Sequence, residues 1–243
     1  PSDPLGTPVL DSIQFADGTS MSYLDVLAQG FDLDGTEGDD FLFGTAVTDR
    51  INGLGGDDTL IGGSGDDVIT GGTENDQLFG QAGRDTYVLN RGDGMDVVDD
   101  ETQEEDASDA SVLRMGAGIV RAEVKFRLDE FRDLLVDAGQ GDTAAFTGFE
   151  ADFPALRTVL GSIEFADGSA MSYGDILAQG FDLQGTEDDD IIHGTGVTDR
   201  VEGMEGNDFA AAGEGDDVLH GGEGDDELDG GAGDDILHGG EDD

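Results

Sequence analysis

The sequence contains no cysteine and no tryptophan, and only four of its 243 residues are proline. Without cysteine there are no disulfides and no thiolate ligands. The three histidines lie outside the loops described below, so no zinc or copper site of the usual kind is expected. A chain without cysteine suits an extracellular bacterial protein that avoids oxidative pairing. It also has no apolar stretch long enough to cross a membrane as a helix.

Positive charge is scarce as well. Ten lysines and arginines stand against 59 aspartates and glutamates, which gives a formal net charge of −49 at pH 7. Because such a chain repels phosphate groups, nucleic acid and anionic membrane surfaces are excluded as direct partners. Acidity alone would also fit a disordered or salt-adapted chain. Here, however, the acidic residues recur at a fixed spacing.

Signatures of catalysis are missing. The sequence has no H-E-x-x-H, no G-x-S-x-G, no phosphate-binding loop and no cysteine nucleophile. Carboxylate pairs are so numerous that none can be singled out as a general acid and base. Their regular spacing fits metal binding better than catalysis, and we therefore predict that the chain is not an enzyme.

Glycine and aspartate, by contrast, are abundant and periodic. Residues 62–70, G-G-S-G-D-D-V-I-T, fit the pattern G-G-x-G-x-D-x-U-x, in which U is a large apolar residue. This nine-residue frame runs without a gap from Gly35 to Val88 and returns from Gly185 to His238. The sixth position is aspartate in all twelve complete rows: Asp40, Asp49, Asp58, Asp67, Asp76, Asp85, Asp190, Asp199, Asp208, Asp217, Asp226 and Asp235.

Each row predicts one turn and one short strand, because its first residues are rich in glycine and its last three alternate outward, inward, outward. Eighteen residues then make one coil, and successive coils stack at about 4.8 Å. The eighth positions should fill a thin core between two facing sheets. They are Leu42, Ile51, Leu60, Ile69, Leu78 and Tyr87, then Ile192, Val201, Ala210, Leu219, Leu228 and Leu237.

Such stacking sets aspartate above aspartate. Two carboxylates about 4.8 Å apart repel by roughly 1 kcal/mol in water and by about 3.5 kcal/mol at an effective dielectric of 20, so a cation between them is required. Carboxylates and carbonyls of glycine-rich loops are hard oxygen ligands, which suits several Ca²⁺ ions. The predicted ligands are the twelve aspartates with carbonyls such as those of Gly53, Gly55, Gly62, Gly71, Gly221 and Gly230.

Some rows depart from the pattern. The glycine at the fourth position of the row is replaced in four rows, by Val47, Glu74, Asp188 and Val197. The glycine at the first position is replaced once, by Ala212. Six rows place three loops on each edge of a block, and hence four sandwiched sites in each block. Because calcium at the departing rows is in doubt, we expect fewer than eight filled sites in the chain.

The rows closely resemble the repeats-in-toxin (RTX, haemolysin-type) calcium-binding repeats. Residues 62–70, 221–229 and 230–238 match at every fixed position, and the rows cover 108 of 243 residues. The resemblance implies a right-handed parallel β-roll, calcium in the loops and type I secretion. The expected fold is therefore all-β, with two such rolls joined by a small β-rich spacer domain that carries a short capping helix.

A second repeat has a longer period. Residues 10–33 recur almost unchanged as residues 160–183, an offset of 150 residues. In both copies a capping-box pair, Ser22 with Asp25 and Ser172 with Asp175, predicts a short helix. The expected domains are the tail of a preceding spacer (1–34), roll one with an exit segment (35–100), the spacer (101–184) and a truncated roll two (185–243).

Because the sequence lacks an initiator methionine and a signal peptide, and its end interrupts a row, we expect a piece of a longer protein.

The spacer differs in composition from the rolls. Five of the ten basic residues lie between residues 111 and 158, and strands are expected near 124–128, 134–136, 144–146 and 159–165. This segment resembles the small β-rich domain often found beside RTX blocks. Its cations are expected to neutralise the adjoining acidic rolls, with binding of an acidic ligand as the alternative.

Two weaker signals lie elsewhere. Residues 91–93 spell Arg-Gly-Asp, an integrin-type tripeptide that three residues at a turn support poorly. His220 and His238 are eighteen residues apart and should stack on one outer face, either as a surface metal pair or as ordinary solvent-facing side chains.

Two classes of function follow. The first is a calcium-folded structural module of a large secreted bacterial protein, such as an adhesin or stalk, unfolded during export and folded by extracellular calcium. Its partners would be calcium, neighbouring repeat units and a cell-surface or carbohydrate ligand. The alternative is the secretion and folding segment of an RTX toxin or secreted hydrolase, or a surface- or sugar-binding module.

Overall fold

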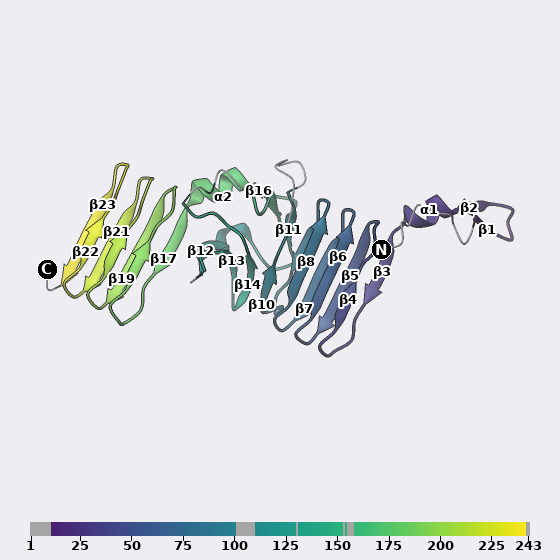
Figure 1. Cartoon of the computed structure of the whole chain (residues 1–243), viewed down its shortest axis with the longest axis horizontal. Coiled ribbons are helices and arrows are strands. Elements are labelled where there is room, and N and C mark those ends of the chain that lie inside the picture. Colours follow the sequence, from purple (N-terminus) through teal and green to yellow (C-terminus); the bar gives the residue numbers. More distant parts are fainter. Residues whose placement is uncertain (1–10, 101–109, 130, 153, 155–157, 242–243) are drawn as a thin grey trace.

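The computed structural model describes residues 11–100, 110–129, 131–152, 154 and 158–241. Strands cross the long axis of an elongated molecule and stack along it, and the two α-helices are short (Figure 1). The predicted all-β class is confirmed. None of the described helices is long and apolar enough to cross a membrane.

Roll one consists of two facing parallel sheets. Their neighbouring strands are related by eighteen residues, as Ile51 opposite Ile69 and Leu60 opposite Leu78 show. This is the register that two rows per coil predict. One sheet contains β3 (Phe31–Asp34), β5 (Asp49–Gly55), β7 (Val68–Thr73) and β9 (Thr86–Leu89), and the other contains β4 (Phe41–Phe43), β6 (Thr59–Ser64) and β8 (Gln77–Ala82).

Roll two repeats this arrangement. Val201 lies opposite Leu219, again eighteen residues apart. One sheet contains β17 (Phe181–Gln184), β19 (Asp199–Glu205), β21 (Val218–Glu223) and β23 (Ile236–Glu241), and the other contains β18 (Ile191–His193), β20 (Phe209–Ala211) and β22 (Glu227–Asp229).

The spacer strands are hydrogen-bonded to both rolls. A single eleven-stranded sheet runs from β23 of roll two to β4 of roll one, and its middle strands come from the spacer and from the segment before it. These are β10 (Met95–Val98), β12 (Lys125–Leu128), β13 (Leu134–Gly139) and β14 (Asp142–Phe146). The three central strands predicted for the spacer are thus present, and β12 and β13 pair antiparallel as partners.

We expected the segment after roll one to leave the stack of strands. The structure shows instead that it continues the stack. Strand β10 pairs in parallel with β8, with Val98 opposite Leu78, and the Val97 N–H donates to the Asp76 carbonyl at 2.8 Å. The second sheet continues likewise from β9 through β11 (Val112–Met115) to β15 (Ser162–Glu164) and β16 (Ala170–Ser172). The short 3₁₀-helix η2 (Arg121–Glu123) precedes β12.

The segment that recurs after 150 residues forms the same elements twice. The first copy contains the hairpin β1 (Ser12–Gln14) and β2 (Ser20–Ser22) and helix α1 (Tyr23–Leu27), and the second contains β15, β16 and α2 (Tyr173–Gln179). Both helices begin with the predicted capping box, in which the serine hydroxyl accepts from the aspartate N–H and the aspartate carboxylate accepts from the serine N–H.

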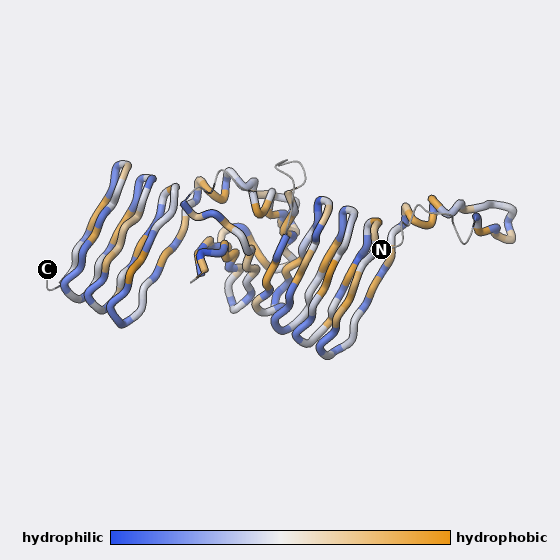
Figure 2. Tube along the Cα trace, viewed as in Figure 1, coloured by the Kyte–Doolittle hydropathy of each residue, from blue (hydrophilic) through white to orange (hydrophobic). Residues whose placement is uncertain are grey.

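The core of the rolls is one side chain thick. Ile51, Leu60, Ile69 and Leu219 at eighth positions are buried, whereas Leu237 on β23 is 43% exposed because β23 is the edge strand of its sheet among the described residues. Figure 2 shows these apolar positions as a line between hydrophilic turns. The core thickens in the spacer, where the buried side chains include Phe126, Phe146 and Phe149.

Candidate calcium sites

The sixth-position aspartates form hydrogen-bonded ladders along the edges of both rolls. From the third row of each roll onward, one carboxylate oxygen, Oδ1, accepts from the backbone N–H of the aspartate eighteen residues earlier. The distance is 2.7 Å from Asp49 N to Asp67 Oδ1 and 2.8 Å from Asp67 N to Asp85 Oδ1. The ladder repeats in roll two, with 2.7 Å from Asp199 N to Asp217 Oδ1. It therefore fixes the orientation of each carboxylate.

The second oxygen, Oδ2, of the interior aspartates is buried and has no hydrogen-bond partner. A buried anionic oxygen without a partner is costly, so each of these groups requires a cation or a proton. The residues concerned are Asp58, Asp67, Asp76, Asp85, Asp208 and Asp217.

The unpartnered oxygens of Asp58, Asp67 and Asp208 lie beside a backbone carbonyl of the next coil. A methyl group added at Gly53 would lie 2.0 Å from Asp58 Oδ2 and 2.4 Å from the Gly71 carbonyl oxygen. At Gly203 the corresponding distances are 2.4 Å to Asp208 Oδ2 and 2.1 Å to the carbonyl oxygen of the glycine eighteen residues later. Only glycine leaves this space open, and its walls are hard oxygens of the kind that calcium prefers.

Side chains alone cannot complete these sites. Among the residues that the structure describes, no three or more His, Cys, Asp or Glu side chains gather as a metal-binding group. A calcium ion takes about 6–8 oxygens, so most of them must come from backbone carbonyls. The glycine-rich loops supply such carbonyls, and the donor set fits calcium.

The family comparison agrees with this geometry. The model of the RTX calcium-binding nonapeptide repeat, in its four-copy form, matches residues 34–69, 61–95, 182–210, 193–228 and 211–243, which together make up just over half of the chain. The chain belongs to this family. Its RTX rows form a structural calcium-binding β-solenoid. A comparison with curated proteins found no match.

Burial raises the pKa of the ladder carboxyls. The pKa reaches about 7 for Asp67, Asp85 and Asp199 and about 6 for Asp76, chiefly because burial penalises the charged form. Neighbouring carboxylates of the ladder add to the shift at Asp67, Asp76 and Asp199. Without a bound cation, Asp67, Asp85 and Asp199 are therefore partly protonated near neutral pH.

The first two rows of each roll differ from the interior. A threonine at their second position donates its N–H to the aspartate Oδ2, at 2.5 Å for Thr45 and Asp49 and at 2.6 Å for Thr186 and Asp190. Asp40 and Asp199 are engaged in the same way, although Asp49 keeps a buried Oδ1 without a partner. Replacement of the fourth-position glycine raised doubt about one of these rows in roll one (Val47) and about both in roll two (Asp188 and Val197), and the threonines are the signal that sequence reasoning missed.

The ladder also continues beyond the predicted rows. Asp96 Oδ1 accepts from the Asp76 N–H at 3.2 Å, and Ser111 Oγ accepts from the Asp85 N–H at 2.9 Å. Burial, followed by the Asp76 charge, raises the pKa of Asp96 to about 8. Residues 94–99, G-M-D-V-V-D, match the last six positions of a row that is shifted by two residues. A search at one fixed nine-residue spacing does not detect this row.

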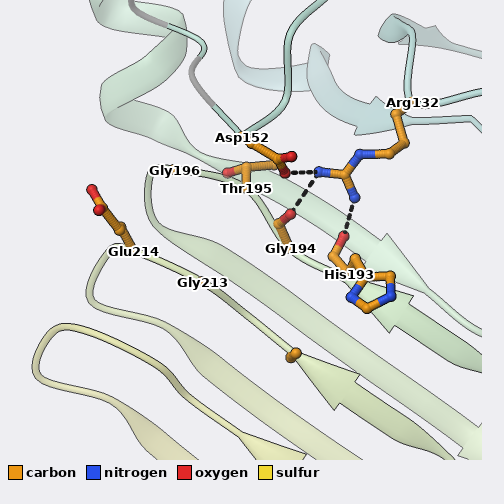
Figure 3. A pocket seen from close by; sticks show the side chains of 9 residues that line it. Arg132, Asp152, His193, Gly194, Thr195, Gly196, Gly213 and Glu214 are labelled. Atoms are coloured by element: carbon orange, nitrogen blue, oxygen red, sulfur yellow. Dashed lines mark hydrogen bonds and ion pairs between the residues drawn. The ribbon is translucent and has the colours of Figure 1, made fainter.

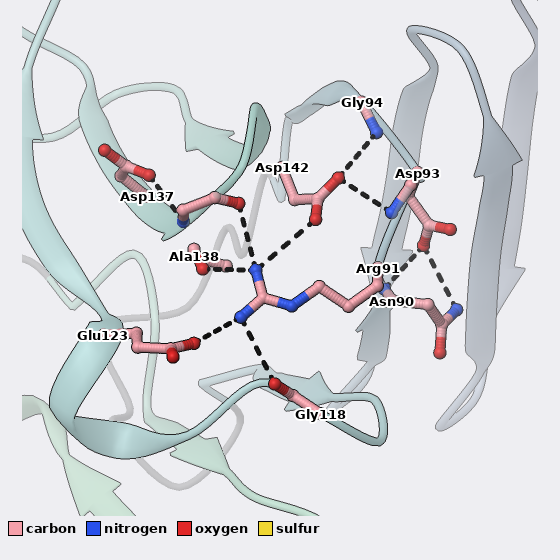
Figure 4. Close-up of polar contacts among 11 residues, drawn as sticks. Asn90, Arg91, Asp93, Gly94, Gly118, Glu123, Asp137, Ala138 and Asp142 are labelled. Atoms are coloured by element: carbon pink, nitrogen blue, oxygen red, sulfur yellow. Dashed lines mark hydrogen bonds and ion pairs between the residues drawn. The ribbon is translucent and has the colours of Figure 1, made fainter.

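The Arg-Gly-Asp tripeptide is engaged inside the molecule (Figure 4). The Arg91 guanidinium donates to the Ala138 and Gly139 carbonyls at 2.6 and 3.0 Å and forms an ion pair with Glu123. Asp93 is buried and accepts from the Asn90 N–H. These contacts join roll one to the spacer and leave no exposed tripeptide for an integrin.

A second arginine lies where the spacer meets roll two (Figure 3). Arg132 lines an open cleft of about 590 Å³ and donates to the carbonyls of His193 and Gly194, each at 2.8 Å. It also pairs with Asp152 at 2.9 Å. The basic spacer residues thus include a cation that binds loop carbonyls of an RTX row directly.

The predicted histidine stack is present. The rings of His220 and His238 lie 4.6 Å apart between centroids with an interplanar angle of 24°. They lie on β21 and β23, directly opposite each other. Within the described residues no further metal-ligating side chains join them.

Proposed function

We propose that the chain is a calcium-folded structural module of a large secreted bacterial RTX protein of the adhesin or stalk type. The observation that carries this proposal is the row of buried Oδ2 atoms without partners. The 150-residue unit and the sheet that is continuous across the spacer support a repeated, load-transmitting rod. We keep the division at residues 34, 100 and 184 and the absence of catalytic activity as parts of this proposal.

The proposed calcium ligands are the interior aspartates, of which Asp58, Asp67 and Asp217 are examples, together with carbonyls of the glycine-rich loops. Bound calcium supplies positive charge that offsets the ladder's negative charge. The ladder hydrogen bonds hold one carboxylate oxygen in place and direct the other toward the loop carbonyls. Asp40, Asp49, Asp190 and Asp199 are weaker candidates, because their Oδ2 atoms already accept from threonine.

Folding coupled to calcium explains how such a rod can be exported. Where calcium is scarce, uncompensated carboxylates and a core one side chain thick favour the unfolded chain, which suits type I secretion. Outside the cell, calcium binds only the folded loops and shifts the equilibrium toward the roll. The extracellular location and the secretion route are part of this proposal.

A secretion and folding segment of an RTX toxin or hydrolase would use the same chemistry. The sheet that joins both rolls favours the rod, because a secretion segment does not require two rolls held in fixed register. A surface- or carbohydrate-binding role would place a ligand on the spacer, and the cleft beside Arg132 is where a screen should begin.

Circular dichroism in the far ultraviolet tests the proposal. A chelated sample is titrated with calcium and, in parallel, with magnesium, which demands stricter octahedral geometry. We expect a cooperative gain of β signal with calcium alone. A chain that is fully folded in chelator would contradict calcium-dependent folding.

A further inference from the structure

The two copies of the 150-residue repeat place the same segment in different surroundings. In the second copy the hairpin, α2 and β17 lie on the spacer, whereas in the first copy the hairpin and α1 project beyond the end of roll one (Figure 1). Residues 10–33 and 160–183 are nearly identical in sequence. A difference in surroundings therefore reflects a missing neighbour.

Burial measures that difference. Phe31 is 37% exposed and its counterpart Phe181 is fully buried, and Ile13 is 37% exposed against 0% for Ile163. Apolar residues of the first copy that are exposed or half-buried while their counterparts in the second copy are buried define what we call the N-terminal apolar face. It consists of Ile13, Phe15 and Phe31 with the half-buried Met21 and Val26. Figure 2 shows the hairpin and α1, which include hydrophobic positions, beyond the end of roll one.

In the second copy the spacer provides the cover. Phe149 packs its ring against Phe181 at a centroid distance of 5.4 Å. Strand β12 pairs in parallel with β17 at Arg127 and Asp182, and β11 pairs with β15. In the first copy, among the residues that the structure describes, β3 is the last strand of its sheet and β1 pairs only with β2. Both strands therefore have a free edge where their counterparts have a partner strand.

Polar contacts show the same asymmetry. In the second copy Arg132 binds the His193 and Gly194 carbonyls, and the Gly196 N–H donates to a spacer carbonyl at 3.0 Å. The counterparts of those two carbonyls belong to Phe43 and Gly44. No guanidinium reaches them within the part of the chain that the structure describes.

We propose that the N-terminal apolar face docks a spacer of the sequence class of residues 110–152, supplied by a further 150-residue unit. That spacer would place its equivalents of Phe149 and Arg132 against Phe31 and the Phe43 carbonyl. A second copy of this chain does not supply it, because its own spacer already covers its own β15 and β17. The inference rests on the tandem arrangement proposed above and does not rest on calcium-dependent folding.

The docked area has a limit that provides an internal control. Ile191, the counterpart of Phe41, remains 73% exposed in the second copy although the spacer is in place there. Docking therefore covers the hairpin, α1 and β3 and leaves Phe41 open to solvent.

The absence of cysteine makes a direct test possible, because a single introduced thiol is the only one present. Ile13→Cys, Ile163→Cys and Phe41→Cys are made in the present chain and in a longer chain in which residues 101–159 precede residue 10. Thiol alkylation is timed in calcium. In the present chain we expect fast reaction at positions 13 and 41 and slow reaction at 163. In the longer chain position 13 should slow by on the order of 100-fold, while position 41 remains fast.

Hydrogen exchange of β3 without any substitution provides a second readout, and protection equal to that of β17 is expected in the longer chain only. Position 13 reacting equally fast in both chains, with β3 unprotected, would overturn the docking proposal. So would protection in the present chain that grows with protein concentration, which would identify a second copy as the occupant. Circular dichroism of the same samples with and without calcium separates this failure from a failure of calcium-dependent folding.

Discussion

The rolls and the spacer balance their buried polar groups in different ways. In the rolls, carboxylate oxygens such as Asp67 Oδ2 are buried without a partner, and the core is one side chain thick. In the spacer the core contains large aromatic side chains, and guanidinium groups of Arg91 and Arg132 bind backbone carbonyls. The spacer therefore carries its own cations, whereas the unpartnered carboxylate oxygens of the rolls require a bound cation or a proton.

Removal of calcium should produce the largest difference in stability between the rolls and the spacer. Because the unpartnered carboxylates of the aspartate ladder lie in the rolls, chelation should abolish amide protection in β5–β9 and β19–β23, while β13 and β14 keep part of theirs. Hydrogen exchange read by mass spectrometry measures each segment separately. Loss of protection at one common rate in spacer and rolls would show that the two regions fold as one unit. It would contradict the proposed difference in how they depend on calcium.

Arg91 tests the internal cation. Replacing it by methionine leaves the Ala138 and Gly139 carbonyls without this donor and Asp142 without its ion-pair partner, and we expect a loss of about 2–3 kcal/mol in unfolding free energy. Arg91→Lys should recover part of this, because lysine keeps the charge and loses the planar fork. Urea denaturation in saturating calcium provides the values. A methionine variant as stable as the parent would contradict a stabilising role for the Arg91 guanidinium.

Acidity should act on the rolls in the absence of calcium. The pKa of Asp67 and Asp85 is raised from 3.8 to about 7 in the folded chain. A raised folded-state pKa contributes stability that is fully present below about 4 and is lost as the pH rises through about 7. In chelator, the β signal of circular dichroism should therefore increase as the pH falls from 8 to 5.

Because protonation of the ladder carboxyls stabilises the folded rolls, the calcium concentration at the folding midpoint should fall as the pH falls from 8 to 5. A midpoint independent of pH over that interval would mean that folding does not raise the pKa of the ladder carboxyls.

The sequence predicted what is local and periodic. The nine-residue frame gave the register of Leu60 and Leu78, the inward positions and the aspartate ladder, and the capping boxes at Ser22 and Ser172 formed as expected. These features depend on residues within one row or one turn. Repetition of one pattern then fixes how neighbouring coils align.

Contacts between distant segments were not predictable in this way. Arg132 reaches a carbonyl 62 residues away and Arg91 one 48 residues away, and no spacing rule connects them. Asp96 joined the ladder because a two-residue insertion was absorbed in the loop before β10, which a rigid frame cannot detect. Thr36 and Thr186 could have been recognised in the sequence. They were not interpreted, because the nine-residue pattern specifies glycine and aspartate but not the threonine at the second position.

The most direct test counts calcium ions bound to matched variants by native mass spectrometry. Asp58→Asn removes charge from an interior carboxylate with an unpartnered Oδ2, whereas Asp40→Asn changes the preceding carboxylate on the same edge, whose Oδ2 accepts from Thr36. We expect Asp58→Asn to bind at least one calcium ion fewer than the parent chain and Asp40→Asn to bind the same number as the parent chain. Equal counts for Asp58→Asn and the parent chain would contradict the claim that the interior aspartates hold calcium.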